Sequence, residues 1–301
     1  MLIDNLIEYK ETGEAKFNSA KQTTTAIVKD LLPKQFEANK NSYKKFINLI
    51  DLLNHYVNST VPKLNTKVML QSYVRKLVKD TYGDDSKNYA YLKDGFSMTS
   101  DEKKTRQTES QDKVVQGNEN QIEITVAQLK IFTGKLIQPK FKIIPSIIMA
   151  QIACGSRLIE ILSKEFEFTE SKIENQIIQN NVAKNRSDAD RPVDKPILFI
   201  TPTVFLALVS LIRSRLTVKK DDDNIKLSNR YGKRVNSKIL KLSEECGMIG
   251  ITSSHDMRRI YANYSYILFG KKNQSLQSWL MLVLGHGDFN STANYSTIKI
   301  I

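Results

Sequence analysis

The sequence predicts an α+β protein with a mainly helical N-terminal domain and a mixed α/β second domain that holds a small β-sheet or hairpin. Residues 1–98 carry apolar side chains at three- and four-residue steps, a period typical of amphipathic helices. Residues 99–121 are almost entirely polar, and residues 122–301 combine helical patterns with short apolar runs of strand length. We therefore expect one domain at 1–98, a linker at 99–121 and a second domain at 122–301.

Two helices stand out in the N-terminal domain. The first covers about residues 43–57, and its apolar stripe consists of Tyr43, Phe46, Ile47, Ile50, Leu53 and Val57. The second covers about residues 68–82, and its apolar side faces away from a basic side formed by Lys67, Arg75, Lys76 and Lys79. His55 lies in the first helix without a partner motif, so it is expected to be a packed or surface histidine.

The polar segment 99–121 has almost nothing to bury, so it is expected to be an interdomain linker or an exposed loop. The whole chain has 45 Lys and Arg against 32 Asp and Glu, and the part after residue 117 carries +9 of the net charge of +13. Such an excess favours a polyanionic partner, with nucleic acid as the leading candidate. The plain alternative is a lysine-rich surface that only keeps the protein in solution.

In the second domain we expect helices near 126–137, 145–162 and 202–216, where apolar side chains recur at helical spacing. An acidic turn is expected at 165–170. The segment 172–182 and the short apolar run 197–200 flank a polar loop, so a β-hairpin is the simplest interpretation. An exposed loop at 219–223 then leads into the basic segment 229–238.

Cysteine content and hydropathy indicate the compartment. Cys154 and Cys246 lie in apolar surroundings without metal-ligand spacing, so they are expected to be small core residues, neither bridged nor bound to zinc. The N-terminus has no basic region followed by a sustained apolar run, and the chain has no apolar run of about 18 residues. Neither secretion nor a membrane partner is expected, which favours the cytoplasm or nucleoid of a prokaryotic or virus-infected cell.

Most of the candidate chemistry lies in one C-terminal segment. A His-x-x-Arg motif at His255 and Arg258 is followed by Leu-Gly-His ending at His286 and, nine residues later, by Tyr295. The chain has three histidines, and two of them fall in this segment. Two imidazoles and a guanidinium supply donors for a phosphate whose charge grows in a transition state, and a phenol supplies a nucleophile. The pattern therefore indicates phosphoryl transfer to tyrosine.

These motifs resemble the C-terminal signature of the tyrosine recombinases, the phage integrases and their relatives. That family has two further catalytic residues upstream, an arginine in a Gly-x-Arg-x-x-Glu helix and a lysine on a β-hairpin. The first matches Arg157, with Glu160 as its structural partner. The second matches Lys184, which lies 27 residues after Arg157, and Lys195 in the same hairpin is its nearest rival.

The resemblance implies a role for each of these residues. Those expected around the scissile phosphate are Arg157, His255, Arg258 and His286. Lys184 would protonate the departing 5′ oxygen as general acid, and Tyr295 would attack to form a 3′-phosphotyrosine bond. No metal and no nucleotide cofactor is expected, and the sequence has no P-loop. The implied partner is double-stranded DNA with an inverted repeat, on which the protein would form a dimer or tetramer.

Two basic segments are candidate DNA contacts. The segment 229–238 and the second N-terminal helix both hold cations that can pair with phosphates. The candidate residues are Arg230, Tyr231, Lys233, Arg234, Lys238, Arg75, Lys76 and Lys79. A solvated helix start remains the alternative for the first segment.

The spacing of the motifs favours one branch of the family. His286 lies 28 residues after Arg258, and an inserted loop follows Phe269, which is more similar to the telomere resolvases, or protelomerases, than to a typical phage integrase. The six residues after Tyr295 suffice for a short strand but not for a C-terminal helix exchanged between protomers. The alternatives are an integrase or recombinase that exchanges strands between two sites, a type IB topoisomerase, and a non-enzymatic DNA-binding protein with a decayed site.

Overall fold

The chain forms two compact units, Met1–Gln111 and Asp112–Ile301. The computed structural model describes residues 2–14, 23–61, 63–137, 140–183, 192–218, 223–285 and 295–301. Two residues with predicted catalytic roles, Lys184 and His286, lie outside these ranges. Within the ranges, no helix combines the length and the hydrophobicity needed to cross a membrane.

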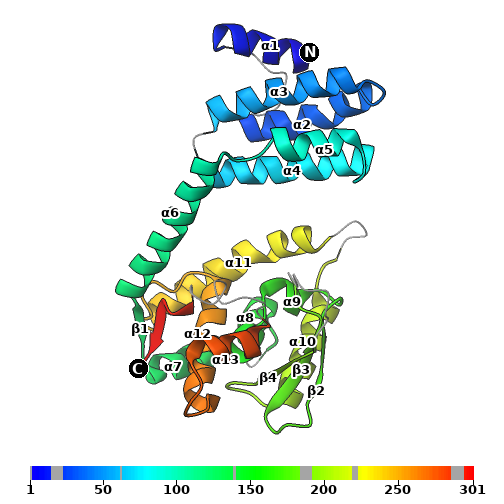
Figure 1. Ribbon diagram of the computed structural model, residues 1–301. Coiled ribbons are helices and arrows are strands. Elements are labelled where there is room, and N and C mark those ends of the chain that lie inside the picture. The colour runs from blue at the N-terminus through cyan, green and yellow to red at the C-terminus, as the bar shows by residue number, and fades with distance from the viewer. Residues whose placement is uncertain are drawn as a thin grey trace. The chain divides into compact units, whose positions relative to one another are not determined.

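The described part of the N-terminal unit is helical (Figure 1). Its elements are α1 (Leu2–Thr12), α2 (Thr24–Ala38), α3 (Tyr43–Thr60), α4 (Leu64–Tyr82), α5 (Lys87–Gly95) and α6 (Ser100–Glu119), the last of which ends in the second unit. The apolar stripe predicted for α3 is confirmed, since Phe46, Ile50 and Leu53 are all buried in the core of this unit. His55 is exposed, as expected for a surface histidine.

Helix α6 replaces the loop or linker expected at 99–121. Its start is a reciprocal cap, in which Glu102 N donates to Thr99 Oγ1 (3.2 Å) and Thr99 N donates to Glu102 Oε2 (2.9 Å). Lys67 of α4, expected on a solvated basic face, is buried and pairs with Glu102. The helix has no apolar stripe, so periodicity missed it, although Thr99 and Glu102 have the spacing of a capping box.

The second unit packs helices around α8 (Ile143–Cys154), and its two small sheets lie at the margins (Figure 1). Its helices are α7 (Val126–Leu136), α8 (Ile143–Cys154), α9 (Leu158–Leu162), α10 (Pro202–Arg215), α11 (Asn224–Glu245), α12 (Ser254–Phe269) and α13 (Leu276–Leu284). Its strands are β1 (Ile122–Ile124), β2 (Glu167–Glu170), β3 (Gln176–Asn180), β4 (Val193–Pro196) and β5 (Ile298–Ile300). Both cysteines are free and buried, as the apolar surroundings of Cys154 and Cys246 predicted.

The expected hairpin corresponds to two strands, β3 and β4, of a three-stranded antiparallel sheet with the order β2-β3-β4. In its register Phe168 pairs with Gln179, and Ile177 pairs with Lys195. The acidic turn expected at 165–170 is therefore wrong over β2, where the Phe168 ring packs edge-on against Phe205 at 5.3 Å between centroids. The strand that pairs with β3 is β4 at Val193–Pro196, so it lies directly before the expected run 197–200. Its buried side chains include Val193 and Lys195.

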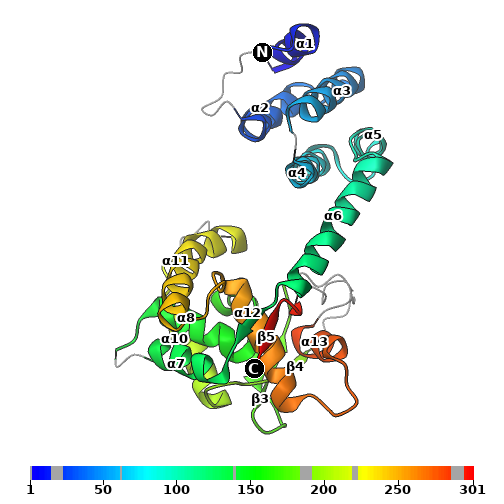
Figure 2. The same ribbon diagram turned by 90° about the vertical axis from the view of Figure 1, so that its left-hand side faces the viewer.

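The last residues of the chain form β5, which pairs in parallel with β1, so that Ile122 faces Ile298 and Ile124 faces Ile300. Figure 2 shows β5 beside α12. Because β5 begins three residues after Tyr295, this small sheet fixes the chain next to the predicted nucleophile.

The helix expected over 145–162 is interrupted at Gly155, where φ is +65° and α8 ends. A Cβ at this position would lie 2.0 Å from the Tyr261 ring, whose hydroxyl donates to the carbonyl of Pro196 at 3.0 Å. Only glycine fits both the left-handed backbone and the close approach of the ring. The break turns the chain so that Arg157 begins the short helix α9.

Gly155→Ala should destabilise the second unit by about 2–5 kcal/mol, because the methyl group is disfavoured at positive φ and overlaps the Tyr261 ring. The matched control is Gly134→Ala in α7, where a Cβ would have no neighbour within 4 Å, and this change should stabilise by about 0.5–1 kcal/mol. Urea unfolding of the full chain measures both. Equal effects of the two substitutions would contradict this account of Gly155.

Candidate active site

The side chain of Arg258 lies at the centre of the candidate site, and it is only 1% exposed. Its Nε donates to the Tyr295 hydroxyl at 2.9 Å, its Nη2 to the carbonyl of Leu284 at 3.0 Å, and its Nη1 to the carbonyl of Gly155. Tyr295 precedes β5, Leu284 ends α13 and Gly155 directly follows α8. One guanidinium therefore joins three segments that are distant in sequence. A buried charge with this many hydrogen bonds is rigidly oriented.

Tyr295 is held against α12. Its side chain is 3% exposed, and its backbone carbonyl accepts a hydrogen bond from Asn263 Nδ2 at 2.8 Å. The ring of His255, one turn before Arg258, lies 5.7 Å from the Tyr295 ring. Three residues of the predicted set, His255, Arg258 and Tyr295, therefore lie together as the sequence motifs indicated.

The start of α12 is fixed by the Asp256 carboxylate. Its Oδ2 accepts from Ser253 N (2.9 Å), Ser253 Oγ (2.8 Å) and Thr252 N (3.1 Å), while its Oδ1 accepts from Arg259 Nη1 (3.0 Å). This cap orients the first turn, on which His255 lies. His255 is exposed, yet desolvation by the surrounding protein and the charges of Arg259 and Arg258 lower the pKa of its imidazole to about 4. The imidazole is therefore neutral at pH 7.

Arg157 and Glu160 form a second rigid pair. Arg157 Nη1 donates to Glu160 Oε1 at 2.7 Å and to the carbonyl of Ala183 at 2.5 Å. Glu160 is fully buried and also accepts from the backbone N–H groups of Arg157 (2.7 Å) and Ala183 (2.9 Å). The hydrogen bonds that the Arg157 side chain makes with the described residues run through Nη1, and the side chain is 24% exposed.

The Glu160 carboxylate also lies 4.0 Å from Arg258, so it links the two arginines. Burial would raise the pKa of Glu160, but the charges of Lys195, Arg258 and Arg157 together lower it to about 2. Arg213 of α10 holds the backbone around this residue, because its Nη2 donates to the carbonyl of Glu160 at 2.9 Å. Sequence analysis recognised Glu160 as a partner of Arg157 but gave no signal for Arg213.

Lys195, the rival for the role of Lys184, is fully buried near Arg157 and Glu160. Its Nζ donates to Ser156 Oγ at 3.1 Å, and that hydroxyl donates to Gln179 Oε1 at 2.8 Å. Burial and the nearby Arg258 lower the pKa of Lys195 to about 8, against the opposite effect of Glu160. The interior position of Lys195 could have been expected from the alternation of residues along β4, where Val193 and Lys195 share a face.

The candidate DNA contacts of α11 fall into two groups. Lys233 and Arg234 are exposed and Lys238 is half-buried, so all three present charge at the surface. Tyr231 is 4% exposed, and its hydroxyl accepts from the Thr217 N–H at 3.0 Å. The prediction that Tyr231 contacts DNA does not fit this position, because its ring belongs to the apolar face of α11. Arg230 is half-buried and donates to the carbonyl of Thr217.

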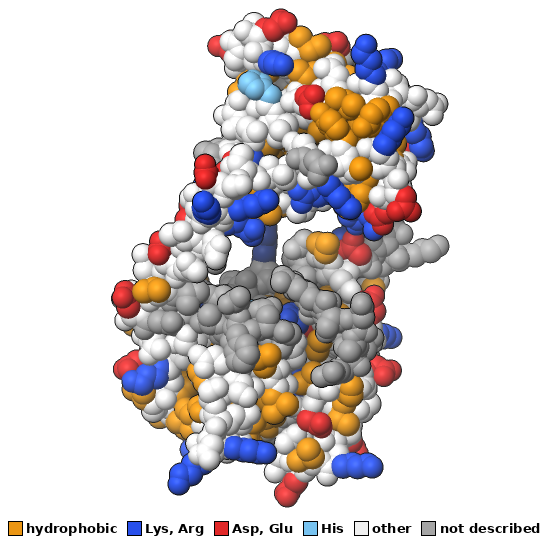
Figure 3. Space-filling view, in the orientation of Figure 1, with side chains coloured by type: hydrophobic (Ala, Val, Ile, Leu, Met, Phe, Trp, Pro, Cys, Tyr) orange, Lys and Arg blue, Asp and Glu red, His pale blue; other side chains and the backbone are white. Residues whose placement is uncertain are grey.

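In the N-terminal unit, Lys and Arg side chains gather over α4 and the start of α6 (Figure 3). Of the candidates on α4, Lys76 is exposed and Lys79 pairs with Asp84. Arg75 is half-buried and donates to the carbonyl of Phe96 at 3.1 Å, which holds the end of α5 against α4. Lys76 is therefore the candidate in this group that is most accessible to a ligand.

The site can bind an anion and supply a nucleophile to it. Two guanidiniums and a buried ammonium outnumber the one carboxylate among them, so the cluster carries excess positive charge. Within the described ranges, His, Cys, Asp and Glu side chains do not gather in groups of three or more as metal ligands would. Lys184 and His286 lie outside the described residues. Ala183, directly before Lys184, accepts a hydrogen bond from Arg157. Leu284, two residues before His286, accepts one from Arg258.

No protein-family model and no curated protein matches this sequence. Solved structures do. Protelomerase TelA covalently complexed with substrate DNA matches with a TM-score of 0.77 at 17% identity, over 99% of this chain and 95% of that one. A TelA variant complexed with DNA hairpin product gives 0.76 at 17% identity, over 98% and 94%. Protelomerase TelK complexed with substrate DNA gives 0.56 at 18% identity, over 100% of this chain and 58% of that one. The chain therefore has the fold of these protelomerases, and the resemblance inferred from the motifs is confirmed at the level of fold.

Glu160→Gln should destabilise the protein by about 3 kcal/mol at pH 7, because it removes a buried carboxylate whose pKa is about 2. A carboxyl group whose pKa is lower in the folded protein than in the unfolded chain stabilises the fold fully above pH 4.5. This stabilisation is lost as the pH falls toward 2. The difference between parent and variant should therefore shrink to less than half near pH 3.

Urea unfolding at several pH values measures this difference. The control is Glu245→Gln, which breaks an exposed pair with Lys135 and should cost much less. A Glu160 effect that does not change with pH would show that the carboxylate charge is not the cause.

Proposed function

We propose that this chain breaks and rejoins DNA by tyrosine recombinase chemistry and acts as a telomere resolvase that forms hairpin DNA ends. The observation that carries the proposal is the hydrogen bond from Arg258 Nε to the Tyr295 hydroxyl, 2.9 Å long and buried. A cation aimed at a phenol oxygen stabilises the phenolate that forms when the phenol loses its proton. Arg157, aligned by Glu160, supplies a second cation for the phosphate.

The first chemical step transfers the phosphoryl group from DNA to Tyr295. The phenol oxygen bonds to phosphorus, and the bond from phosphorus to the 5′ oxygen breaks, which leaves a 3′-phosphotyrosine ester and a 5′ hydroxyl. The phenol proton passes to His255, whose ring lies beside that of Tyr295, and the negative charge of the bound phosphate raises the pKa of the imidazole that accepts it. The ester conserves the phosphodiester energy, so rejoining needs no nucleotide.

The second step reverses the first with a different nucleophile. A 5′ hydroxyl gives its proton to Lys184 and attacks the phosphotyrosine ester, Tyr295 leaves, and its oxygen recovers a proton from His255. If the hydroxyl belongs to the opposite strand of the same DNA end, the product is a hairpin. The fold shared with protelomerase TelA, whose solved structures include a complex with DNA hairpin product, supports this outcome over exchange between two sites.

Lys184 is our choice for the general acid that protonates the departing 5′ oxygen. A general acid must reach the atom that it protonates, and Lys195 is fully buried with its ammonium on Ser156. The backbone of Ala183, directly before Lys184, is bound on both sides by Arg157 and Glu160. Lys195 instead positions Ser156 and balances the charge of Glu160.

Tyr295→Phe should abolish covalent protein–DNA adducts and hairpin ends, because it removes the nucleophile while keeping the ring. The purified chain is incubated with duplexes that carry inverted repeats, and the products are separated on denaturing gels. Hairpin ends that require Tyr295 support the resolvase. Exchanged linear products would make the protein an integrase or recombinase instead, relaxed plasmid without sequence preference a topoisomerase, and the absence of any Tyr295-dependent adduct would refute the catalytic proposal.

Lys184→Ala should slow cleavage of ordinary DNA by about 10²- to 10⁴-fold. On DNA whose departing 5′ oxygen is replaced by sulfur, the variant should cleave nearly as fast as the parent, because a thiolate leaves without a proton. Lys195→Met, which keeps an unbranched side chain of similar size in the interior, should slow both substrates alike. Selective rescue of the Lys195 variant, without rescue of the Lys184 variant, would reverse the assignment.

A further inference from the structure

A groove of about 730 Å³ opens on the second unit between the start of α8 and the middle of α11. Its floor is aliphatic, with Ile143, Ile144 and Pro145 from α8. Its rim is basic, and none of the nine described residues that line it is acidic. An apolar floor under several cations does not suit a free inorganic anion, but it suits a ligand with alternating apolar and anionic groups.

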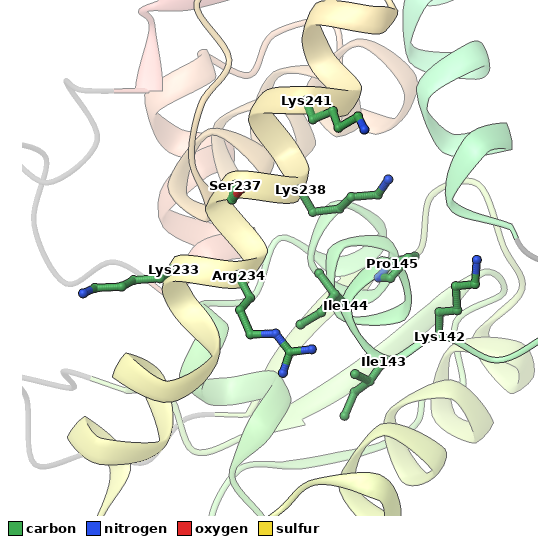
Figure 4. Close-up of a pocket in the computed structure, with 9 residues that line it drawn as sticks. All are labelled: Lys142, Ile143, Ile144, Pro145, Lys233, Arg234, Ser237, Lys238 and Lys241. Atoms are coloured by element: carbon green, nitrogen blue, oxygen red, sulfur yellow. The ribbon is translucent and has the colours of Figure 1, made fainter.

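The cations of the groove lie in a row. Arg234, Lys238 and Lys241 follow one another at steps of four and three residues, which places them on one face of α11. Figure 4 shows Lys238 and Lys241 extending from α11 toward the side on which Lys142 lies, whereas Lys233 extends in the opposite direction. The row is about 10 Å long, so its three cations can pair with neighbouring phosphates of one DNA strand.

Both walls of the groove continue into the candidate active site. On α11, the side chain of Asn236 accepts a hydrogen bond from the Ser254 N–H at 2.9 Å, directly before His255. On the other wall, α8 starts at Ile143 and ends just before Gly155, whose carbonyl accepts from Arg258. Twelve helical residues span about 18 Å, so the floor of the groove lies about that far along α8 from Arg258.

We infer that this groove binds the sugar–phosphate backbone of one DNA strand away from the scissile phosphate. Successive phosphates pair with the Arg234, Lys238 and Lys241 row and with Lys142 opposite, while the deoxyribose rings lie over Ile143 and Ile144. The inference rests on the proposed function, which makes DNA the substrate, and adds a second contact region to it. Of the contacts proposed from sequence, Arg234 and Lys238 belong to this region, and Lys142 and Lys241 are new.

The groove is tested with a triple variant, Lys142→Gln, Lys238→Gln and Lys241→Gln, in the full chain. Its control removes the same charge from exposed lysines outside the groove, Lys130→Gln, Lys164→Gln and Lys272→Gln. Binding of a fluorescent duplex is measured across a range of salt concentrations. Each lost phosphate contact lowers the slope of log affinity against log salt by about 0.9, so over a fourfold rise in salt the parent should lose about 40-fold more affinity than the groove variant. The control should keep the slope of the parent.

A second measurement does not depend on removing charge. Ser237→Cys places a thiol in the groove, while Cys154 and Cys246 are buried. Duplex at about ten times its Kd should slow the reaction of this thiol with a maleimide by about tenfold, because only the unbound fraction of the protein reacts. Ser214→Cys is the control, because Ser214 is an exposed residue of α10 outside the groove, and its thiol should react at the same rate with and without DNA.

The outcomes separate the two proposals. Equal salt slopes for the groove and control variants, or a Ser237→Cys thiol that DNA does not protect, would overturn the groove, even if the parent forms Tyr295-linked adducts. A groove effect without any adduct would support the groove and overturn the catalytic proposal. A parent that does not bind the duplex at all would overturn both.

Discussion

The second unit depends on the burial of one guanidinium. Arg258 is almost fully enclosed, and a buried charge is tolerated only when it is paired and hydrogen-bonded. Its partners come from the end of α8, the end of α13 and Tyr295, with Glu160 nearby as counter-charge. These segments are distant in sequence, so the site forms only when the whole unit is folded. The same contacts that satisfy the charge also place the nucleophile.

The charges around Arg258 do not cancel. Arg157 and Lys195 are both close to Glu160, and the charges of the neighbouring cations lower its pKa. Desolvation is the larger cause of the lowered pKa values of Lys195 and His255, and neighbouring arginines add to it. Like charges held together in the interior cost stability, and an anion bound among them relieves that cost. A phosphate that gains negative charge as it becomes five-coordinate would be stabilised most, which is the property that catalysis requires.

Local patterns in the sequence predicted the parts of the fold that depend on local patterns. The stripe of α3, the helices α7 and α10, the short strand β5 and the His255–Arg258 turn all follow from spacing along the chain. Two of the failures have long-range causes, and the third is local. Lys67 is buried because it pairs with Glu102, which lies 35 residues further along the chain. The strand β2 is held by the packing of Phe168 on Phe205, 37 residues away. Tyr231 was assigned to the surface from its basic neighbours, although its own period along α11 places it on the buried face.

The central claim, that Tyr295 is the nucleophile of a DNA breaking and rejoining reaction, is tested most directly by mapping the covalent adduct. The chain is incubated with inverted-repeat DNA that carries a nick just beyond the scissile phosphate, so that the released fragment diffuses away and the adduct accumulates. The complex is digested with protease and nuclease, and its peptides are sequenced by mass spectrometry. The account predicts a nucleotide on the peptide that contains Tyr295, attached through its 3′ phosphate. A nucleotide on another residue, or attachment through a 5′ phosphate, would contradict it.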